Sequence, residues 1–390
     1  MEMEMDTGSS FLLEFSEEQR AIQEAVRDFA VSVLKPVVME YDESQKFPFE
    51  IVKELAGMGC MGILVPETYG GSGLGYTEYA LIIEELARID PSVALTVAAH
   101  NGLCTNHILM HANEEQKRKY LPKLASGEWI GAWGLTEPVS GSDAASMITT
   151  AVKEGDEWVI NGSKTFITHG GVGQVAVIMA VTDKSKHSKG ISAFIVETDT
   201  PGYIVNKKEN KLGMRSSDTC QLMFDNMRVP AENLIGVEGE GFKQAMKILE
   251  GGRISIAALS VGLAQGSLDE SLKYSGERHQ FGKPINAFQG IQFKFADMAT
   301  EIEAARLMTY KAASLKDAGK PLGNSAAMAK LFASEVAERC SNEAVQIFGG
   351  YGFIKDFPVE KFYRDVKLLT IGEGTSEVQR IVISRQLLDK

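Results

Sequence analysis

Cysteine is scarce in this sequence, with four residues in 390 and no CxxC pair. Their wide spacing excludes zinc ribbons and thioredoxin-like motifs and predicts free thiols in a reducing compartment. These residues are Cys60, Cys104, Cys220 and Cys340. Long hydrophobic runs are lacking too, because the longest apolar stretch, residues 175–181, is far too short to cross a bilayer. We therefore expect no membrane span.

Positive charge is also in short supply. The chain has 40 Lys and Arg against 52 Asp and Glu, a net charge of −12, and no basic run, so we expect no nucleic-acid partner. The first ten residues, MEMEMDTGSS, are acidic and show no export or import pattern, which predicts a cytoplasmic protein. The remaining composition, 44% hydrophobic and 24% charged, is that of a globular protein with a large core.

The hydrophobic patterns divide the chain into three predicted domains, as its length of 390 residues allows. Residues 1–127 show helical periodicity, beginning with a capping box at Ser16 and Gln19. Residues 128–238 carry short β-rich runs and predict an antiparallel, barrel-like sheet. Residues 239–390 return to helices, one of them about 38 residues long, and predict a four-helix bundle. The expected fold class is α+β multidomain.

Two familiar patterns do not predict a site. Gly171, Gly173 and Ala176 match GxGxxA, but they precede a strand-like run instead of opening a helix, so the dinucleotide fingerprint is rejected. His107 and His111 lie four apart on a predicted helix without the glutamate of HExxH, so we expect no metal site. The sequence has no GxSxG, P-loop or zinc-finger spacing.

Two loops combine glycine with polar side chains. Residues 134–146, GLTEPVSGSDAAS, can present hydroxyls and backbone N–H groups to a heterocycle or a phosphate, or form a domain-junction turn held by its own hydrogen bonds. Residues 346–365 contain GGYG at a predicted helix end, where glycines allow close approach of a ligand or simply stop the helix.

A third segment, TIGEGTSEVQ at 370–379, places one carboxylate between two glycines. Glu373 follows an apolar run and precedes a helix that we expect to start at Ser376, with Gln379 three residues later. Taken alone, Glu373 is either an ordinary loop residue or a base on a backbone that bends sharply against another molecule.

These three segments together identify a family. The sequence resembles the acyl-CoA dehydrogenases from about Phe15 to Leu388, and it looks most similar to their short-chain type. The two loops fit the two signature patterns of that family, and EGTSEVQR fits its catalytic stretch. The order of helices, β section and helices also agrees with the family architecture.

The resemblance implies an FAD site between the β domain and the C-terminal bundle, with the adenine end reaching a neighbouring subunit. The implied flavin contacts are Trp133, Leu135, Thr136, Ser142, Phe166, Ile167 and Thr168. The implied contacts to the pyrophosphate and adenosine are Arg278, Phe281 and Gln289, with Gln346, Ile347, Phe348, Gly349 and Gly350 of the neighbouring chain. Thr375, Ser376 and Glu377 would complete the site.

The resemblance also implies a reaction, the dehydrogenation of a short- to medium-chain acyl-CoA to trans-2-enoyl-CoA. Glu373 would abstract the α-proton, and the β-hydride would pass to flavin N5. Glu250 and Arg253 would grip the CoA thioester, with Ser142 and Gly374 close by. Electron-transferring flavoprotein would accept the electrons, and the family precedent is a homotetramer.

Three departures from the family pattern bear on the substrate and the flavin. Gly372 stands where many relatives have an aromatic residue, which predicts a wider pocket for branched or longer chains. Phe166 and His169 replace the usual Trp and Asn beside the flavin.

Some relatives carry the base on the long helix, one residue before Arg253, but this chain has Gly252 there.

Three alternative functions stay open at this point. A decarboxylating glutaryl-CoA-type dehydrogenase would need a cation for the distal carboxylate, and the predicted pocket floor, VALTVAAHNGL, offers only His100. An acyl-CoA oxidase would differ in oxygen access, which the sequence does not show. A non-catalytic flavin-binding scaffold would have no need of Glu373 and Arg253.

Overall fold

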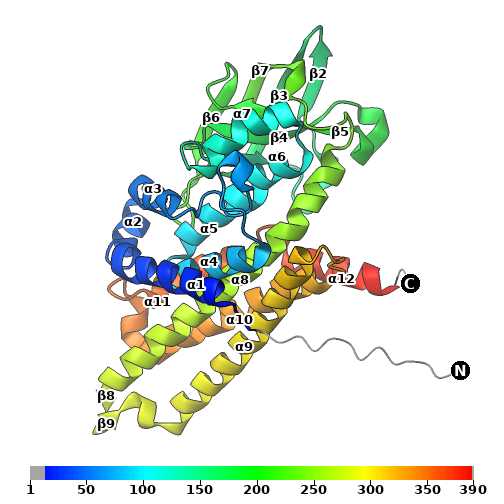
Figure 1. Cartoon of the computed structure of the whole chain (residues 1–390). Coiled ribbons are helices and arrows are strands. Elements are labelled where there is room, and N and C mark those ends of the chain that lie inside the picture. Colours follow the sequence, from blue (N-terminus) through cyan, green and yellow to red (C-terminus); the bar gives the residue numbers. More distant parts are fainter. Residues whose placement is uncertain (1–13, 389–390) are drawn as a thin grey trace, which may run out of the picture.

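The computed structural model describes residues 14–388 and confirms the expected fold class. A helical N-terminal section, a β section and a helical C-terminal section follow one another along the chain. In Figure 1 the sheet lies at one end of the molecule and the long C-terminal helices extend away from it, with the N-terminal helices against their side. All four cysteines are buried and free, as predicted.

The N-terminal section is built from short helices whose ends follow local signals. They are α1 (Glu17–Phe29), α2 (Val38–Ser44), α3 (Phe49–Gly57), α4 (Tyr76–Ala87), α5 (Pro91–Ala99), α6 (Asn106–His111) and α7 (Glu114–Ala125). Ser16 and Gln19 form the predicted capping box of α1. A π-helical turn, His100–Thr105, separates α5 from α6 within the N-terminal section that the sequence predicts to be helical.

The β section forms one seven-stranded sheet. Its strands are β1 (Gly131–Gly134), β2 (Thr150–Glu154), β3 (Glu157–Thr168), β4 (Val175–Val181), β5 (Ile191–Glu197), β6 (Tyr203–Lys208) and β7 (Thr219–Pro230). The strand order is β1-β4-β2-β3-β7-β6, with β5 paired to β4. The sheet is mixed and not purely antiparallel, because β4 runs parallel to both β1 and β2, which it reaches by crossovers and not by hairpins.

The C-terminal section is dominated by long helices. Its elements are α8 (Gly241–Glu277), the hairpin β8 (His279–Gln280) and β9 (Lys283–Pro284), α9 (Gln289–Asp317), α10 (Ser325–Phe348), α11 (Val359–Asp365) and α12 (Ser376–Leu388). The predicted helix of about 38 residues is α8, with 37 residues. It runs from the sheet to the hairpin and packs against α4, α9 and α10 (Figure 1). Between residues 14 and 388, no helix is long and apolar enough to span a membrane.

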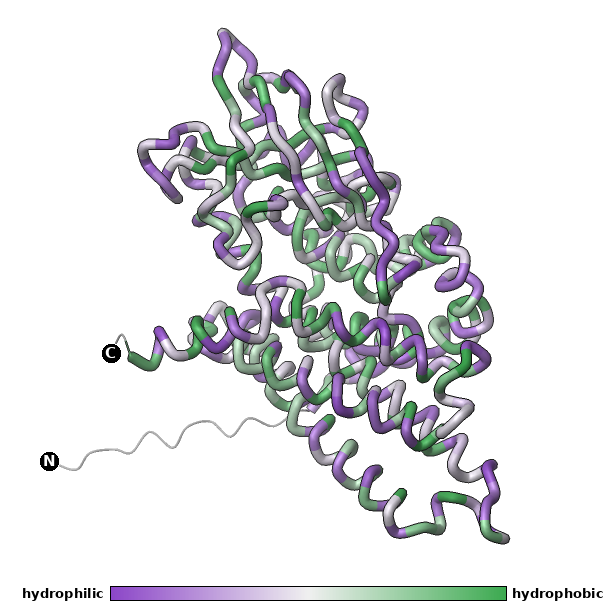
Figure 2. The backbone as a smooth tube through the Cα atoms, turned by 180° about the vertical axis from the view of Figure 1, so that it is seen from behind, coloured by the Kyte–Doolittle hydropathy of each residue, from purple (hydrophilic) through white to green (hydrophobic). Residues whose placement is uncertain are grey.

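The largest hydrophobic core joins the two helical sections. Buried side chains of α1, α3, α4 and α5 pack in it against α8, α9 and α10. A second core joins α6 and α7 to one face of the sheet, and a third lies within the sheet. Figure 2 shows hydrophilic and hydrophobic residues alternating along the outer helices, which is the pattern of helices with one buried face.

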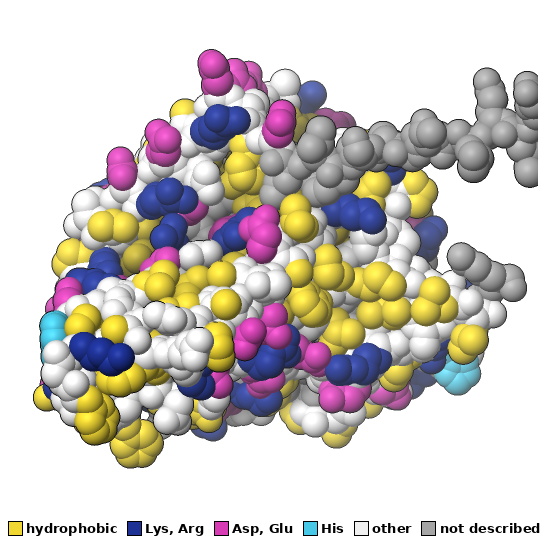
Figure 3. All heavy atoms as spheres, turned by 90° about the horizontal axis from the view of Figure 1, so that it is seen from below, with side chains coloured by type: hydrophobic (Ala, Val, Ile, Leu, Met, Phe, Trp, Pro, Cys, Tyr) yellow, Lys and Arg dark blue, Asp and Glu magenta, His cyan; other side chains and the backbone are white. Residues whose placement is uncertain are grey.

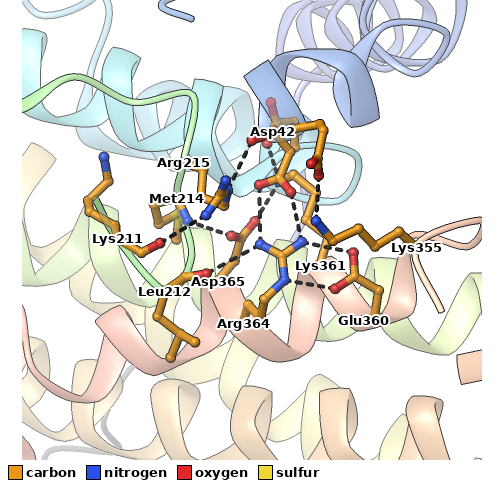
Figure 4. Close-up of polar contacts among 12 residues, drawn as sticks. Asp42, Lys211, Leu212, Met214, Arg215, Lys355, Glu360, Lys361, Arg364 and Asp365 are labelled. Carbon is orange, nitrogen blue, oxygen red and sulfur yellow. Dashed lines mark hydrogen bonds and ion pairs between the residues drawn. The ribbon is translucent and has the colours of Figure 1, made fainter. Parts of the chain in front are cut away.

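A cluster of charged side chains ties the three sections together (Figure 4). Arg364 on α11 forms an ion pair with Asp42 on α2, with 2.7 Å between Nη2 and Oδ2. Asp365, also on α11, accepts a hydrogen bond from the Met214 backbone N–H, which belongs to the segment after β6. Lys361 neutralises Asp365 from one helical turn away. The cluster therefore links residues far apart in the sequence.

Candidate active site

Glu373 lies in a short turn between a 3-10 segment, Val366–Thr370, and α12. Its backbone is left-handed, with φ of 53°, and the next residue, Gly374, has φ of 94°. The helix starts at Ser376 as expected. Its cap differs from the prediction, because the capping side chain is Thr375 and not Ser376: Thr375 Oγ1 accepts the Val378 N–H at 3.3 Å. A threonine hydroxyl meets the same unpaired N–H groups as a serine would, so the sequence signal alone did not separate the two.

The Glu373 carboxylate faces the backbone of α8. Its Oε2 atom is buried and accepts no hydrogen bond from residues 14–388. A Cβ atom on Gly252 would overlap with Oε2, so the carboxylate occupies the space that a side chain at that position would fill. Burial raises the pKa of Glu373 to about 7, although the positive charges of Lys330 and Arg253 oppose it.

Two cations therefore lie near this carboxylate, and only one was predicted. Arg253 was expected, and its Nε is buried without an acceptor among the described residues. Lys330 on α10 was missed; its Nζ donates to the Gly374 carbonyl at 2.7 Å. A lysine inside the apolar run SAAMAKLFAS was the available signal, since buried lysines are rare. Glu250, in contrast, is half-buried and pairs with Lys247.

Tyr79 on α4 closes this site from another side. Its ring is fully buried, and its hydroxyl donates to the Ala98 carbonyl at 2.6 Å. Burial, with the nearby Glu373 charge adding to it, raises the pKa of Tyr79 well above its ordinary value. Gly102 lies against the same hydroxyl, where a Cβ would approach to 2.6 Å. No pattern in the sequence predicts that Tyr79 lies beside Glu373.

The first predicted flavin loop lies against β3. Thr165 donates its N–H to the Thr136 carbonyl at 2.9 Å, which brings Phe166 beside the loop. Phe166 is 67% exposed and has φ of 59°. The half-buried Trp133 donates its indole N–H to His107 Nδ1 at 3.0 Å, so its ring orientation is fixed. Burial lowers the pKa of His107 to about 3, which leaves it neutral and able to accept.

A buried ion pair lies beneath this loop. Lys164 on β3 and Glu137 are separated by 2.7 Å, and their side chains are 0% and 1% exposed. Lys164 also donates to the Leu135 carbonyl, and Glu137 accepts the backbone N–H groups of Ile148 and Thr149. Lys164 therefore fastens the start of the loop to β3, and Glu137 ties it to the segment that follows the loop.

The other residues assigned to the flavin differ in what they expose. Leu135 and Ile167 are buried in the core, so only their backbones can face a ligand. Ser142 is exposed within the loop, and Thr168 ends β3 in register with Thr219. His169 does not share the exposure of Phe166: it is fully buried, and its Nδ1 lies 3.0 Å from the Gly131 carbonyl.

The residues assigned to the adenosine end form a separate group at the far end of α8. Arg278 lies over the ring of Tyr351, 5.5 Å from its centroid, and Tyr351 directly follows Gly350. Phe281 is 94% exposed and contacts Phe288 edge-on, next to Gln289. The segment assigned to the neighbouring chain, Gln346, Ile347, Phe348, Gly349 and Gly350, ends α10 here.

One chain does not bring all the predicted residues together. Arg253 and Arg278 are 25 positions apart on or next to α8, which is about 37 Å along a helix axis. Trp133 reaches α8 through His107 and Gln244, about 12 Å along the axis from Gly252. Thr375, the buried Ser376 and the exposed Glu377 stay beside Glu373.

The geometry around Glu373 suits proton abstraction. A carboxylate with a pKa near neutrality can take a proton at neutral pH and hold it during a reaction. The neighbouring cations Arg253 and Lys330 keep part of the carboxyl population ionised despite burial. The site therefore has a base, two positive charges and an aromatic wall.

Comparison with known proteins identifies the family. The family models of the three acyl-CoA dehydrogenase domains match this sequence. The N-terminal domain model matches residues 16–128, the middle domain model residues 132–227 and the C-terminal domain model residues 239–388. A short-chain specific acyl-CoA dehydrogenase of Clostridium acetobutylicum is 50% identical over 370 residues, 95% of this chain and 98% of that protein.

Solved structures agree over nearly the full length. Butyryl-CoA dehydrogenase of Megasphaera elsdenii superposes with a TM-score of 0.95 at 45% identity, covering 97% of this chain and 100% of that one. A chain from a structure described as the electron transferring flavoprotein of Acidaminococcus fermentans reaches 0.96 at 47% identity, with coverage of 97% and 100%. A glutaryl-CoA dehydrogenase of Mycobacterium smegmatis in complex with FADH2 reaches 0.92 at 33% identity, covering 96% of both chains. The chain belongs to the acyl-CoA dehydrogenase family.

Proposed function

We propose that this enzyme dehydrogenates a short-chain acyl-CoA thioester and that Glu373 is the base that removes the α-proton of this substrate. The observation that carries the proposal is the Glu373 Oε2 atom, which is buried, free of hydrogen bonds within residues 14–388, and turned toward Gly252. Because Gly252 has no side chain, the carboxylate can occupy the space beside the α8 backbone. The names of the Clostridium and Megasphaera relatives support a short acyl chain.

The neighbouring residues receive roles that follow from their chemistry. Arg253 would attract the negatively charged CoA moiety, since its guanidinium has an unused donor, and Glu250 would face the same substrate near the outer surface. Ser142 and Gly374 would contact the substrate from the loop and from the turn. Tyr79 would limit the depth of the acyl site from the side of α4.

The residues of this chain also fit FAD. The exposed Phe166 ring, the fixed Trp133 and the hydroxyls of Thr136 and Thr168 would hold a flat heterocycle. Arg278 lies over Tyr351 without a carboxylate partner in the described chain and would meet a pyrophosphate, and the exposed Phe281 would cover an adenosine. FAD bound there would supply the acceptor for the β-hydrogen. The FADH2 complex of the Mycobacterium relative supports this cofactor.

A homo-oligomer would complete this cofactor site. The two groups of residues are too far apart along α8 for one dinucleotide, so a second copy would supply the adenosine contacts, including Gln346 to Gly350. Exposed hydrophobic side chains support such contacts. Figure 3 shows them gathered on the face opposite the sheet, and those of the C-terminal section include Phe281, Phe293 and Phe353. We propose a homotetramer.

Electron-transferring flavoprotein would reoxidise the enzyme. The neighbour from Acidaminococcus fermentans, whose description names that protein, supports this partner. The cytoplasmic location expected from the sequence stays a prediction.

Product analysis tests the substrate class. The purified protein would be incubated with butyryl-CoA, isobutyryl-CoA and octanoyl-CoA and an artificial electron acceptor, and the thioesters separated by chromatography. We expect crotonyl-CoA from butyryl-CoA at the highest kcat/KM. A preference for isobutyryl-CoA or octanoyl-CoA would contradict the short straight chain and favour the wider pocket predicted from Gly372.

A further inference from the structure

Three lysines are fully buried among residues 14–388, and one of them differs from the other two. Lys164 is paired with Glu137, and Lys361 is paired with Asp90 and Asp365. Lys330 forms no ion pair within the described chain, and its Nζ donates to the backbone carbonyl of Gly374 instead. A buried ammonium without a carboxylate is costly, so its presence beside this turn calls for a physical role.

The turn that Lys330 contacts is held in an unfavourable conformation. Glu373 has a left-handed backbone, which residues other than glycine seldom adopt, and Gly374 continues it. The Gly374 carbonyl accepts two hydrogen bonds, from Lys330 Nζ at 2.7 Å and from Gln379 Nε2 at 3.0 Å. Gln379 also donates to the Glu373 carbonyl at 3.3 Å and is fully buried. The side chains of Lys330 and Gln379 therefore hold the turn through its carbonyl groups.

We propose, on the basis of the function proposed above, that Lys330 is the positioning residue of the base: it fixes the left-handed turn that points the Glu373 carboxylate at Gly252, and it places a positive charge near that carboxylate. Lys330 touches neither substrate nor flavin in this account. It acts through Glu373.

The charges around Lys330 and Glu373 agree with this role. Glu373 faces Lys330 on α10, Arg253 on α8 and the neutral Tyr79 on α4. Lys330 faces Glu373, Arg253 and Glu377 on α12. Burial lowers the pKa of Lys330 to about 8. Lys330 is therefore mostly charged near pH 7, the pH at which Glu373, with a pKa of about 7, titrates. Removal of Lys330 would leave only Arg253 to oppose the effect of burial on Glu373.

The test compares Lys330→Met, Lys330→Arg and a control, Lys311→Met, which changes an exposed lysine on α9. Flavin reduction by saturating butyryl-CoA would be followed anaerobically from pH 5.5 to 9. For Lys330→Met we expect a limiting rate at least about tenfold lower and a pH midpoint about one unit higher, with substrate affinity nearly unchanged. Lys330→Arg should restore the midpoint, and Lys311→Met should behave as wild type.

The proposal is overturned if Lys330→Met keeps the wild-type pH midpoint of flavin reduction. It is also overturned if Lys330→Arg shifts this midpoint as far as Lys330→Met does. If Lys330→Met does not retain its flavin, Lys330→Gln gives the same measurement, because its amide keeps a donor without a charge. Wild-type protein that butyryl-CoA does not bleach would contradict the proposed function instead. Lys330 would then be tested through the pKa of Glu373, obtained from the pH dependence of thermal unfolding relative to Glu373→Gln.

Discussion

At the scale of single residues, the contact between Glu373 and Gly252 is the tightest constraint on the chemistry. Gly252→Ala would add a Cβ into the space of Oε2 and push the carboxylate away from its position. We expect kcat with butyryl-CoA to fall about 100-fold, since a displacement of about 1 Å has this effect on a catalytic group.

The control for this substitution lies on the same helix. Gly276→Ala adds the same methyl group at an exposed position of α8, where the nearest atom, Asn286 Nδ2, is 3.5 Å away. It should leave kcat unchanged and slightly stabilise the helix. Equal losses in both variants would contradict a role of Gly252 in making room for the base.

The raised pKa of Glu373 predicts a pH dependence of stability. A carboxyl group with a folded pKa of about 7, against an ordinary 4.5, contributes stability that is fully present below pH 4.5 and is lost as pH rises through 7. Wild type should therefore lose about 3 kcal/mol between these limits relative to Glu373→Gln. Thermal unfolding at pH 5 and pH 8 measures this, and a difference between the two proteins that is equal at both pH values would refute it.

At the scale of elements, the buried pair Lys164–Glu137 joins the first signature loop to β3. Lys164→Met would leave Glu137 buried without its cation, and we expect a loss of about 3–5 kcal/mol together with weaker flavin retention. Arg228→Met is the control, because Arg228 forms exposed pairs on β7 that are worth at most about 1 kcal/mol. Urea unfolding and flavin release measure both effects, and equal losses would contradict the account.

Most helices and strands were predictable from the sequence, and the predictions that failed did so for physical reasons. Local signals, such as the Ser16 cap and the long apolar segment in the middle of α8, fix where helices form. The π-helical turn His100–Thr105 was not predictable, since His100 and Asn101 in it bond to residues far along the chain. The parallel pairing of β4 was missed for the same reason: strand partners are chosen by the tertiary fold and not by local pattern.

At the scale of the whole molecule, the cluster around α11 connects all three sections (Figure 4). Lys361 pairs there with Asp90 at 2.7 Å and with Asp365, and all three side chains are buried. Lys361→Met would leave two buried carboxylates without a cation, so we expect a loss of about 3–5 kcal/mol and a less cooperative unfolding transition.

A neighbouring pair provides the control. Lys355 and Glu43 also join the C-terminal and N-terminal sections, but both side chains are exposed. Lys355→Met should change stability by less than about 1 kcal/mol. Calorimetry that finds one unchanged transition in Lys361→Met would contradict the role of the cluster in joining the sections.

The candidate site was predictable only in part from the sequence. Glu373 and Arg253 stand in motifs that resemble a family, so their proximity was expected. Lys330 and Tyr79 come from α10 and α4, and only the packing of these helices against α8 brings them to the turn. The sequence also does not show how far Arg278, at the end of α8, lies from Glu373, which contacts the helix at Gly252.

The most direct test of Glu373 as the base is an anaerobic titration with butyryl-CoA while the visible flavin spectrum is recorded. We predict that the flavin band of the wild-type protein bleaches near stoichiometric substrate. Glu373→Gln should bind the same flavin and the same substrate without bleaching. If Glu373→Gln bleaches at the wild-type rate, Glu373 is not the base, and the mechanism proposed here is wrong.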